Sequence, residues 1–192
     1  ADAVIVANDC PDHAPAAIAA LQAGRSVLSE VTACHTLAQA ARLAEAVEAA
    51  GGKYMLAENC LYSNPMMELR HLARTGALGP MRYAEGDYVH DCRYLMFPDR
   101  PGHWRNWLPP LHYTTHPLGP ILRASGDRPA RVVGMHTGAH LPGTAGGIDM
   151  GSMLVQTAGG GSTASESYRI EVRMGAPQPA GSVSSDNFNA RV

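Results

Sequence analysis

The sequence predicts an α/β protein in which a parallel sheet is followed by an α+β region with an open-faced, mainly antiparallel sheet. Short apolar segments alternate with alanine-rich helical segments over residues 3–59, the order typical of a parallel α/β sheet. Residues 81–90 alternate in polarity, which is typical of a strand with one open face. Hydrophobic residues make up 45% and charged residues 17% of the 192-residue chain, as in ordinary globular proteins.

The first two predicted strands enclose a helix. The apolar run AVIVA (3–7) has the composition of a buried parallel strand. A polar turn, NDCPDH, leads into APAAIAALQAG, a predicted helix that ends at Gly24. The segment RSVLSE (25–30) follows as the second strand.

A capping pattern marks the second helix. Thr36 and Gln39 stand three residues apart, as the N-cap and N3 residues of a capping box do. The alanine-rich segment LAQAARLAEAVEAAGG then predicts a helix that ends at Gly51 and Gly52. The third strand is KYMLAEN (53–59), which completes two strand–helix–strand units.

The second half of the chain predicts one helix and several strands. Asn64 and Pro65 begin a helix that ends at Gly76. Residues 131–138 and 148–157 are predicted strands. The remainder is rich in Gly and Ser (AGGGSTASES), and we expect little regular structure there. The predicted divisions of the chain are therefore 1–60, 61–157 and 158–192.

The composition excludes several classes of function. A net charge of −2 and a pI near 6.5 give no basic footprint for nucleic acid, and no apolar run approaches the ~18 residues of a membrane span. The four cysteines are widely spaced and contain no CxxC pair, which favours reduced thiols and a cytoplasmic location. Lys53 is the single lysine against fourteen arginines, so nearly every candidate for a catalytic lysine is absent.

Polar residues follow each predicted parallel strand. Parallel sheets bind ligands at the carboxyl ends of their strands, where this chain has NDCPDH, then Glu30, then Glu58 with Asn59. Solvated loops are the alternative interpretation. We expect Glu30 to be partly shielded, so that its carboxylate holds ribose hydroxyls or caps a helix. The imidazole of His13 either contacts a ligand or caps the turn before the helix.

The segment LHYTTHPLGP (111–120) allows three interpretations. His112 and His116, four residues apart, would share a helix face as metal ligands, although no HExxH glutamate accompanies them. Tyr113 and His116 would otherwise pack and hydrogen-bond within a core. As a third interpretation they form an acid/base pair, because a phenol titrates near ~10 and an imidazole near ~6.5. Arg105 would bind substrate oxygens or stack on the neighbouring tryptophans.

Taken together, these stretches resemble one enzyme family. The pattern AVIVA…DHAPAAIAALQAGRSVLSE…LAEAVEAAGGKYMLAEN is similar to the second part of the Rossmann-like nucleotide-binding domain of the glucose-fructose oxidoreductase / inositol dehydrogenase family. The continuation AENCLYSNPMMELRHLARTGALGPMRYAEGDYVHD resembles the passage into its substrate domain. The resemblance covers residues 2–157. It implies that residues 1–60 are a partial dinucleotide-binding domain and that 61–157 are a substrate and oligomerisation domain.

Within this family the chain most resembles the NAD-dependent glycosidases of glycoside hydrolase family 109. Dehydrogenases of the wider family carry Glu-Lys-Pro where this chain has Glu30-Val31-Thr32, whereas the glycosidases carry Glu-Val-Pro. The pairs and motifs Asn59-Cys60, Tyr88-Val89-His90-Asp91 and Tyr113-x-x-His116 also match the glycosidases. The turn Cys10-Pro11-Asp12 departs from the aromatic-rich loop that this branch has before its His.

The resemblance implies two sets of site residues. Those that would line the NAD site are Cys10, Pro11, Asp12, His13, Glu30, Val31 and Asn59. Those of the sugar pocket are Glu58, Tyr88 and Arg105 for binding, with Tyr113 and His116 as the catalytic pair. The implied reaction is glycoside hydrolysis by transient oxidation at C3, elimination across C2 and C1, addition of water and re-reduction. A simple NAD(P)-dependent sugar dehydrogenase and a non-catalytic binding module stay open as alternatives.

The resemblance also carries expectations about the state of the chain. The family's glycine-rich phosphate turn is absent from this sequence and is expected before Ala1. We therefore expect an N-terminally truncated chain that binds NAD poorly and is inactive by itself. Open-faced sheets of this kind often pair between subunits, so a homo-oligomer is expected, with no nucleic acid and no membrane as partners.

Overall fold

The computed structural model describes residues 1–89, 91–140, 147–159, 169–174 and 188–191. The chain divides into two compact units, Ala1–Glu58 and Asn59–Val192, and each is described by itself. None of the helices in the described ranges has the length and apolar content that crossing a bilayer requires.

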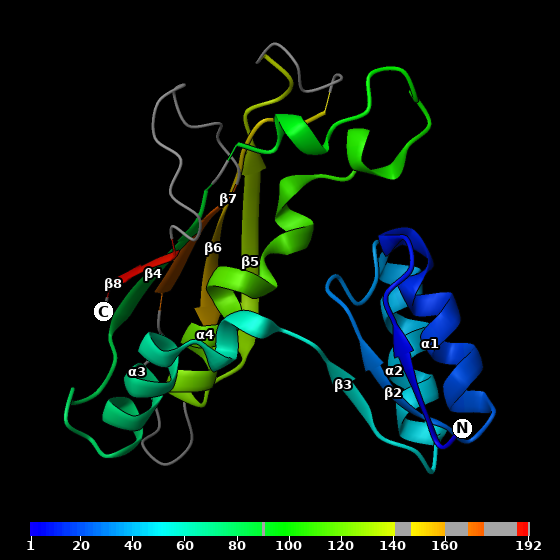
Figure 1. The fold of residues 1–192 in the computed structure, drawn as a ribbon. Coiled ribbons are helices and arrows are strands. Elements are labelled where there is room, and N and C mark those ends of the chain that lie inside the picture. Colours follow the sequence, from blue (N-terminus) through cyan, green and yellow to red (C-terminus); the bar gives the residue numbers. More distant parts are fainter. Residues whose placement is uncertain (90, 141–146, 160–168, 175–187, 192) are drawn as a thin grey trace. The chain divides into compact units, whose positions relative to one another are not determined.

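The first unit is a three-stranded parallel sheet with two helices. Strands β1 (Ala3–Val6), β2 (Ser26–Ser29) and β3 (Tyr54–Leu56) are parallel, as the sequence predicts, and lie in the order β1-β2-β3. Helices α1 (His13–Gln22) and α2 (Leu37–Ala49) connect them, and the short 3-10 helix η1 (Cys10–Asp12) precedes α1 (Figure 1). Strand, helix, strand, helix, strand is the predicted order, and it is confirmed.

The core of this unit lies between the sheet and its helices. Its buried members come from β1, β2 and the inner faces of both helices: Val6, Ala17, Ile18, Leu21, Val27 and Leu43. The other face of the sheet carries an apolar row, because the register aligns Ile5 with Leu28 and Leu28 with Met55. Ile5 is 74% and Met55 47% exposed. The alternation of side chains along the strands therefore leaves one face covered and one open.

The second unit is built on a mixed, mainly antiparallel sheet. Its strands β4 (Tyr83–Tyr88), β5 (Pro129–His136), β6 (Gly151–Thr157), β7 (Arg169–Met174) and β8 (Phe188–Arg191) lie in the order β5-β6-β7-β4-β8. The pair β4–β7 is parallel, and the other three pairs are antiparallel. The predicted fold class, a parallel sheet followed by a mainly antiparallel one, is confirmed.

Strands β7 and β8 correct one expectation about the C-terminal region. The Gly- and Ser-rich composition of residues 158–192 predicts little regular structure there, and of these residues 160–168, 175–187 and 192 lie outside the described ranges. The structure instead places β7 between β6 and β4 and places β8 on the outer side of β4. The segments RIEVRM and FNAR carry the β-branched and aromatic residues of strands, which the surrounding glycines and serines obscured.

Two helices and several 3-10 turns accompany this sheet. Helix α3 (Asn64–Arg74) follows η2 (Asn59–Tyr62) and packs against α4 (Thr115–Ser125), which in turn packs on β4. Along the chain, β4 and α4 are connected by three 3-10 turns: η3 (Arg93–Leu95), η4 (Trp104–Asn106) and η5 (Pro110–Tyr113). Helix α4 ends at Gly126, whose positive φ of 70° suits glycine and whose N–H donates to the Leu122 carbonyl.

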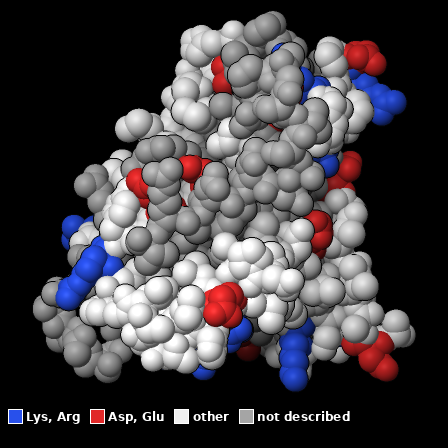
Figure 2. All heavy atoms as spheres, turned by 60° about the vertical axis from the view of Figure 1, so that its left-hand side comes forward, with Lys and Arg blue, Asp and Glu red and all other residues white. Residues whose placement is uncertain are grey.

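The core of the second unit lies where α4 covers the sheet. Ala84 of β4, Ile121 of α4 and Val155 of β6 are buried there, and the rings of Tyr88 and Tyr113 pack against them. The surface is mixed in charge: Figure 2 shows acidic and basic side chains interspersed on the face it draws, without a patch of either sign among the described residues.

Candidate active site

The loops that follow β1 and β2 are joined by the buried side chain of His13, which is 1% exposed. Its Nδ1 lies 2.8 Å from the Thr32 carbonyl oxygen, and its Nε2 lies 2.9 Å from the Asn8 carbonyl oxygen. Carbonyl oxygens only accept hydrogen bonds, so the ring donates to both loops when both nitrogens carry a proton. This placement favours a role for His13 in holding the loops over direct contact with a ligand.

A second connection between these loops comes from Gln39 of α2. Its Nε2 donates to the Pro11 carbonyl at 3.0 Å, and its Oε1 accepts from the His35 backbone N–H at 2.9 Å. The Thr36 hydroxyl accepts from the Gln39 backbone N–H at 3.1 Å, so the predicted N-cap is confirmed. The Gln39 side chain departs from the capping box, because it bonds the residue before the cap rather than the cap itself.

The other predicted cofactor residues of the first unit differ in exposure. Cys10 and Val31 are buried, at 2% and 6% exposed, and Pro11 is half-buried. Asp12 and Glu30 are exposed. The expectation that Glu30 is shielded is wrong, because side chains alternate at the end of β2: Ser29 points inward, at 0% exposed, and Glu30 points away.

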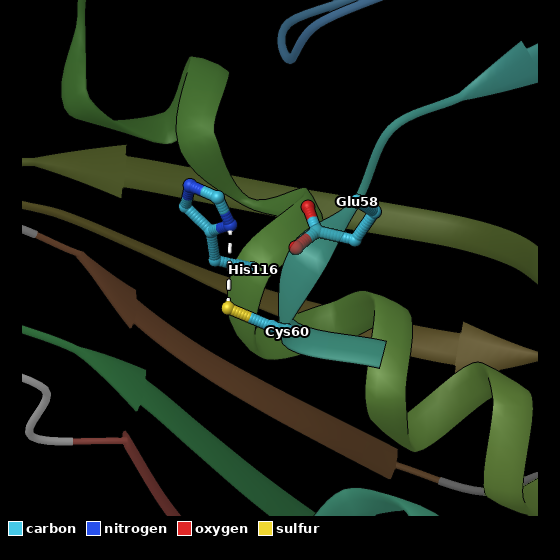
Figure 3. A group of neighbouring side chains, drawn as sticks. All are labelled: Glu58, Cys60 and His116. Atoms are coloured by element: carbon cyan, nitrogen blue, oxygen red, sulfur yellow. Dashed lines mark hydrogen bonds between the residues drawn. The ribbon is translucent and has the colours of Figure 1, made fainter. Parts of the chain in front are cut away.

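In the second unit the imidazole of His116 lies at the centre of a cluster of predicted site residues. It is 7% exposed and stands in the first turn of α4. Its Nδ1 lies 3.4 Å from Cys60 Sγ, which comes from η2 (Figure 3). Glu58, 3% exposed, precedes η2 by one residue along the chain. Asn59, the first residue of η2, is exposed.

Two phenol rings accompany this imidazole. The Tyr88 ring, at the end of β4, lies 4.5 Å from the His116 ring between centroids, with an interplanar angle of 43°. The Tyr113 ring, at the end of η5, lies 5.9 Å away and is nearly parallel to the imidazole, at 18°. The structure therefore brings Tyr88, Tyr113 and His116 together, although β4 and α4 are far apart in the sequence.

A close approach between β4 and α4 positions these rings. A Cβ at Gly86 would lie 2.9 Å from the Pro117 carbonyl oxygen and 3.1 Å from Ile121 Cδ1, so glycine is what allows the strand and helix to touch there. Tyr88 lies two residues further along the same face of β4. The ring of Tyr88 is thereby directed toward the first turn of α4, where His116 stands.

Arg105 lies in a loop that is fastened by Asn106. The Arg105 guanidinium stacks over the Trp104 ring, 4.3 Å from its centroid. Asn106, 5% exposed, accepts from the Phe97 backbone N–H and donates to the carbonyls of Phe97 and Arg100, at 2.8 to 2.9 Å. The stacking that the sequence analysis gave as an alternative for Arg105 is what the structure shows.

The structure brings together a different set of possible metal ligands from the one that the sequence offered. Three side chains offer metal-binding atoms within 4.8 Å of one another, and they are Glu58, Cys60 and His116. In the metal interpretation of the sequence the partner of His116 is His112, which is half-buried at η5 and does not belong to this group. The 3-10 conformation of residues 110–113 breaks the helical spacing that would have placed both imidazoles on one face.

Burial changes the acidity of two other thiols. Burial raises the pKa of Cys92, the negative charge of Asp91 raises it further, and the Arg105 guanidinium opposes both. Burial also raises the pKa of Cys34, with a smaller contribution from Cys10. Both side chains therefore hold their protons more tightly than an exposed thiol does.

Sequence reasoning missed Cys60 and Asn106 as members of these clusters. In the sequence, Cys60 is notable only as half of the Asn59-Cys60 pair, yet its sulfur faces the imidazole of His116 in the structure. Its position two residues after Glu58 was the available signal. Asn106, within HWRNWLPP, carried no signal of its own, because its role depends on carbonyls that the loop brings together only when folded.

The chain is similar to known proteins over most of its length. No protein-family model matches it. Over 147 residues it is 33% identical to glycosyl hydrolase family 109 protein 2 of Phocaeicola vulgatus, covering 70% of this chain and 36% of that protein. Over 140 residues it is 30% identical to an alpha-N-acetylgalactosaminidase of Bacteroides fragilis, covering 66% of this chain and 33% of that protein. The chain thus spans about a third of the length of these curated relatives.

A solved structure shares the fold. An inositol dehydrogenase homolog of Azotobacter vinelandii, crystallised with NADH and myo-inositol, matches with a TM-score of 0.73 at 24% identity. The match covers 94% of this chain and 46% of that one. The fold of this chain is therefore shared with about half of that solved structure.

Proposed function

We propose, because this chain is a homologue of the glycosyl hydrolase family 109 proteins, that it is part of an NAD-dependent enzyme that hydrolyses glycosides. The observation that carries the proposal is the cluster in which the Tyr113 and Tyr88 rings lie 5.9 and 4.5 Å from the His116 ring. A phenol beside an imidazole supplies one group that holds a proton near neutral pH and one that exchanges it. Both are required where C–H and O–H bonds of a sugar break.

The first unit fits one half of the dinucleotide. Glu30 is an exposed carboxylate at the end of β2, where it would accept hydrogen bonds from ribose hydroxyls. The backbone of residues 10–13, held by His13 and Gln39, would contact the nicotinamide. The sequence of the first unit, residues 1–58, contains no G-x-G-x-x-G motif for the pyrophosphate. Bound NAD would supply reversible oxidation at the C3 carbon of the sugar.

Side chains around His116 would transfer the protons of the reaction. We assign to Tyr113 the proton of the C3 hydroxyl, and to His116 the proton on C2, which becomes acidic once C3 is a ketone. The Nδ1 atom of His116 faces Cys60, so Nε2 is the atom we assign to this exchange. Tyr88 and Glu58 would orient the sugar, and Arg105, which stacks on Trp104, would bind its oxygens.

The name of one relative supports a proposal for the substrate class. One of them is named an alpha-N-acetylgalactosaminidase, and we propose an α-linked N-acetylhexosaminide for this chain. The test uses an aryl α-N-acetylgalactosaminide with NAD in deuterated water. Elimination removes the C2 proton and solvent returns one, so the released sugar is expected to carry deuterium at C2, measured by proton NMR. Release of sugar without deuterium at C2 would refute the mechanism.

A simple sugar dehydrogenase is the second candidate, because the structural relative with NADH and myo-inositol shares this fold. A dehydrogenase accumulates reduced cofactor in proportion to the sugar consumed. The glycosidase regenerates its cofactor in each cycle and needs it only in catalytic amount. Absorbance of the reduced cofactor during turnover therefore separates the dehydrogenase from the glycosidase. A chain that neither binds NAD nor turns over sugar would instead be a non-catalytic binding module.

The open face of the second sheet supports a homo-oligomer. On β5, Val133 and Met135 project from the face opposite α4, at 66% and 69% exposed, and Tyr83 of β4 lies on the same face. Apolar side chains this exposed on one sheet are typical of an interface. We expect Val133→Glu to lower the molecular mass measured by sedimentation equilibrium to that of one chain, whereas Arg131→Glu, on the same strand, would not.

We also propose a reducing, cytoplasmic environment. The structure joins none of its four cysteines (Cys10, Cys34, Cys60 and Cys92) in a disulfide, and the sulfur of Cys60 faces the imidazole at the centre of the proposed site. Oxidation of that sulfur would remove its contact with His116.

A further inference from the structure

Three different metal-binding atoms converge beside α4. The carboxylate of Glu58, the sulfur of Cys60 and Nδ1 of His116 all lie within 4.8 Å of one another (Figure 3). Glu58 and Cys60 are separated by one residue, so the chain itself keeps their side chains close, and α4 supplies the imidazole. We propose that these three side chains form a zinc-binding site, and this proposal does not depend on the proposed function.

The spacing of the donor atoms suits one tetrahedral ion. Zinc binds sulfur at about 2.3 Å and imidazole nitrogen at about 2.0 Å, so two such ligands on one tetrahedral ion lie about 3.5 Å apart. Cys60 Sγ and His116 Nδ1 are 3.4 Å apart. An ion therefore fits between them after the thiol loses its proton, without a movement of η2 or α4.

The site is held in place by its surroundings. Glu58 is 3% and His116 7% exposed, and Cys60 is half-buried. η2, which carries Cys60, packs directly on α4. The rings of Tyr88 and Tyr113 restrict the plane of the imidazole. Binding would therefore order few side chains, and such preorganisation favours affinity.

The chemistry of the donors selects the ion. A thiolate is a soft ligand that zinc accepts readily, whereas magnesium and calcium prefer oxygen. Three protein ligands would leave the fourth tetrahedral position for water or another small ligand. Zinc on Nδ1 would also fix the imidazole and compete with its protonation, so on the proposed function zinc acts as an inhibitor rather than as a requirement.

The experiment titrates the reduced, metal-free 192-residue chain with Co²⁺, which reports thiolate ligation by a charge-transfer band in the near ultraviolet. Competition with Zn²⁺ then gives the zinc dissociation constant. We expect one equivalent of cobalt and a thiolate band, both lost in Cys60→Ser. His116→Gln and Glu58→Gln are expected to raise the dissociation constant by at least about tenfold, the size of effect seen when the surroundings of metal ligands are altered.

Matched thiol variants serve as controls. Cys34→Ser and Cys92→Ser remove cysteines that lie outside the group, and both are expected to keep the band and the affinity. Zinc is also expected to raise the midpoint of thermal unfolding of the parent chain but not of Cys60→Ser, because only a folded site gains from the ligand. Circular dichroism shows whether each variant is folded. An unchanged dissociation constant in folded Cys60→Ser, or no thiolate band in the parent chain, would overturn the proposal.

Discussion

Contacts of two kinds hold the imidazole of His116. A sulfur faces Nδ1, and two phenol rings lie against the ring itself. The sulfur contact settles which nitrogen is directed to the rest of the site. The phenol rings restrict rotation. A proton-transfer group is most effective when its geometry is fixed in this way before the substrate arrives.

We expect His116→Gln to lower kcat/KM for the glycoside by about a hundredfold or more, because a positioned acid or base contributes about 10²- to 10⁴-fold. Tyr113→Phe keeps the ring stacked and removes only the hydroxyl, and it should lower kcat with little change in KM. The measurement is initial rates in a chain that turns over. Full activity in both variants would show that neither side chain transfers a proton.

The raised pKa of Cys92 predicts a dependence of stability on pH. The folded chain holds this proton more tightly than the unfolded chain does, so the unfolded chain loses it first as the pH rises. The stability that the protonated Cys92 thiol contributes to the folded chain is therefore fully present below the ordinary thiol pKa of about 8.5. It is lost as the pH rises through the raised pKa of the folded chain. We expect the free energy of unfolding in urea to fall as the pH rises above about 8.5, and to fall less in Cys92→Ser. An equal fall in both chains would exclude Cys92 as the source.

For single residues, the sequence predicted which side chains belong to the site better than it predicted what surrounds them. Tyr113 and His116 could be paired because they lie three residues apart, but the addition of Tyr88 and Cys60 required contacts between distant segments. Glu30 was expected to be shielded because an apolar strand precedes it. The direction of its side chain depends on which residue ends β2, and a shift by one residue reverses that direction.

Among the elements, the contact of β4 with α4 depends on Gly86, which has no side chain. The space at Gly86 is closed by a backbone carbonyl, which cannot rotate away as a flexible side chain would. The strand and helix can therefore approach closely at this point, and Tyr88 and His116 meet as a result.

Gly86→Ala should lower the free energy of unfolding by about 1–3 kcal/mol, the usual cost of extra volume in a packed core. Gly134→Ala is the matched control: it lies in β5, and its nearest atoms to a new Cβ are 3.7 Å away. Urea unfolding of both variants provides the measurement. A loss in Gly134→Ala as large as that in Gly86→Ala would show that glycine-to-alanine exchange in this sheet is costly in itself.

The elements of the first unit were predictable because each strand and helix carries its own periodicity and end signals. The C-terminal strands were not. β7 pairs with β4 and β6, which lie far apart in the sequence, and such pairing leaves no local pattern. The predictable elements are thus those that local interactions specify.

In the whole molecule, the two units have separate hydrophobic cores. Leu21 belongs to the first and Ile121 to the second, and both are almost fully buried. Among the described residues the two cores share no member, so we expect each unit to unfold in its own transition. The free energies of unfolding predicted above for Cys92 and Gly86 are those of the second unit's transition.

Leu21→Ala and Ile121→Ala should each cost about 2–5 kcal/mol, and each should act on its own unit. Hydrogen exchange followed by mass spectrometry reads the two units separately. We expect faster exchange in α1 and β2 for Leu21→Ala and in α4 and β4 for Ile121→Ala. Equal acceleration in both units by either variant would show that they unfold together.

The contacts of His13 have a consequence for how this protein can vary. The imidazole holds the two loops through the carbonyl oxygens of Asn8 and Thr32, atoms that every amino acid carries. The connection therefore does not depend on the side chains at positions 8 and 32, whereas it does depend on the imidazole at position 13. Homologues should keep histidine at position 13 while the sequences of the two loops diverge. Ligand specificity could then change while the backbone of the loops stays in place.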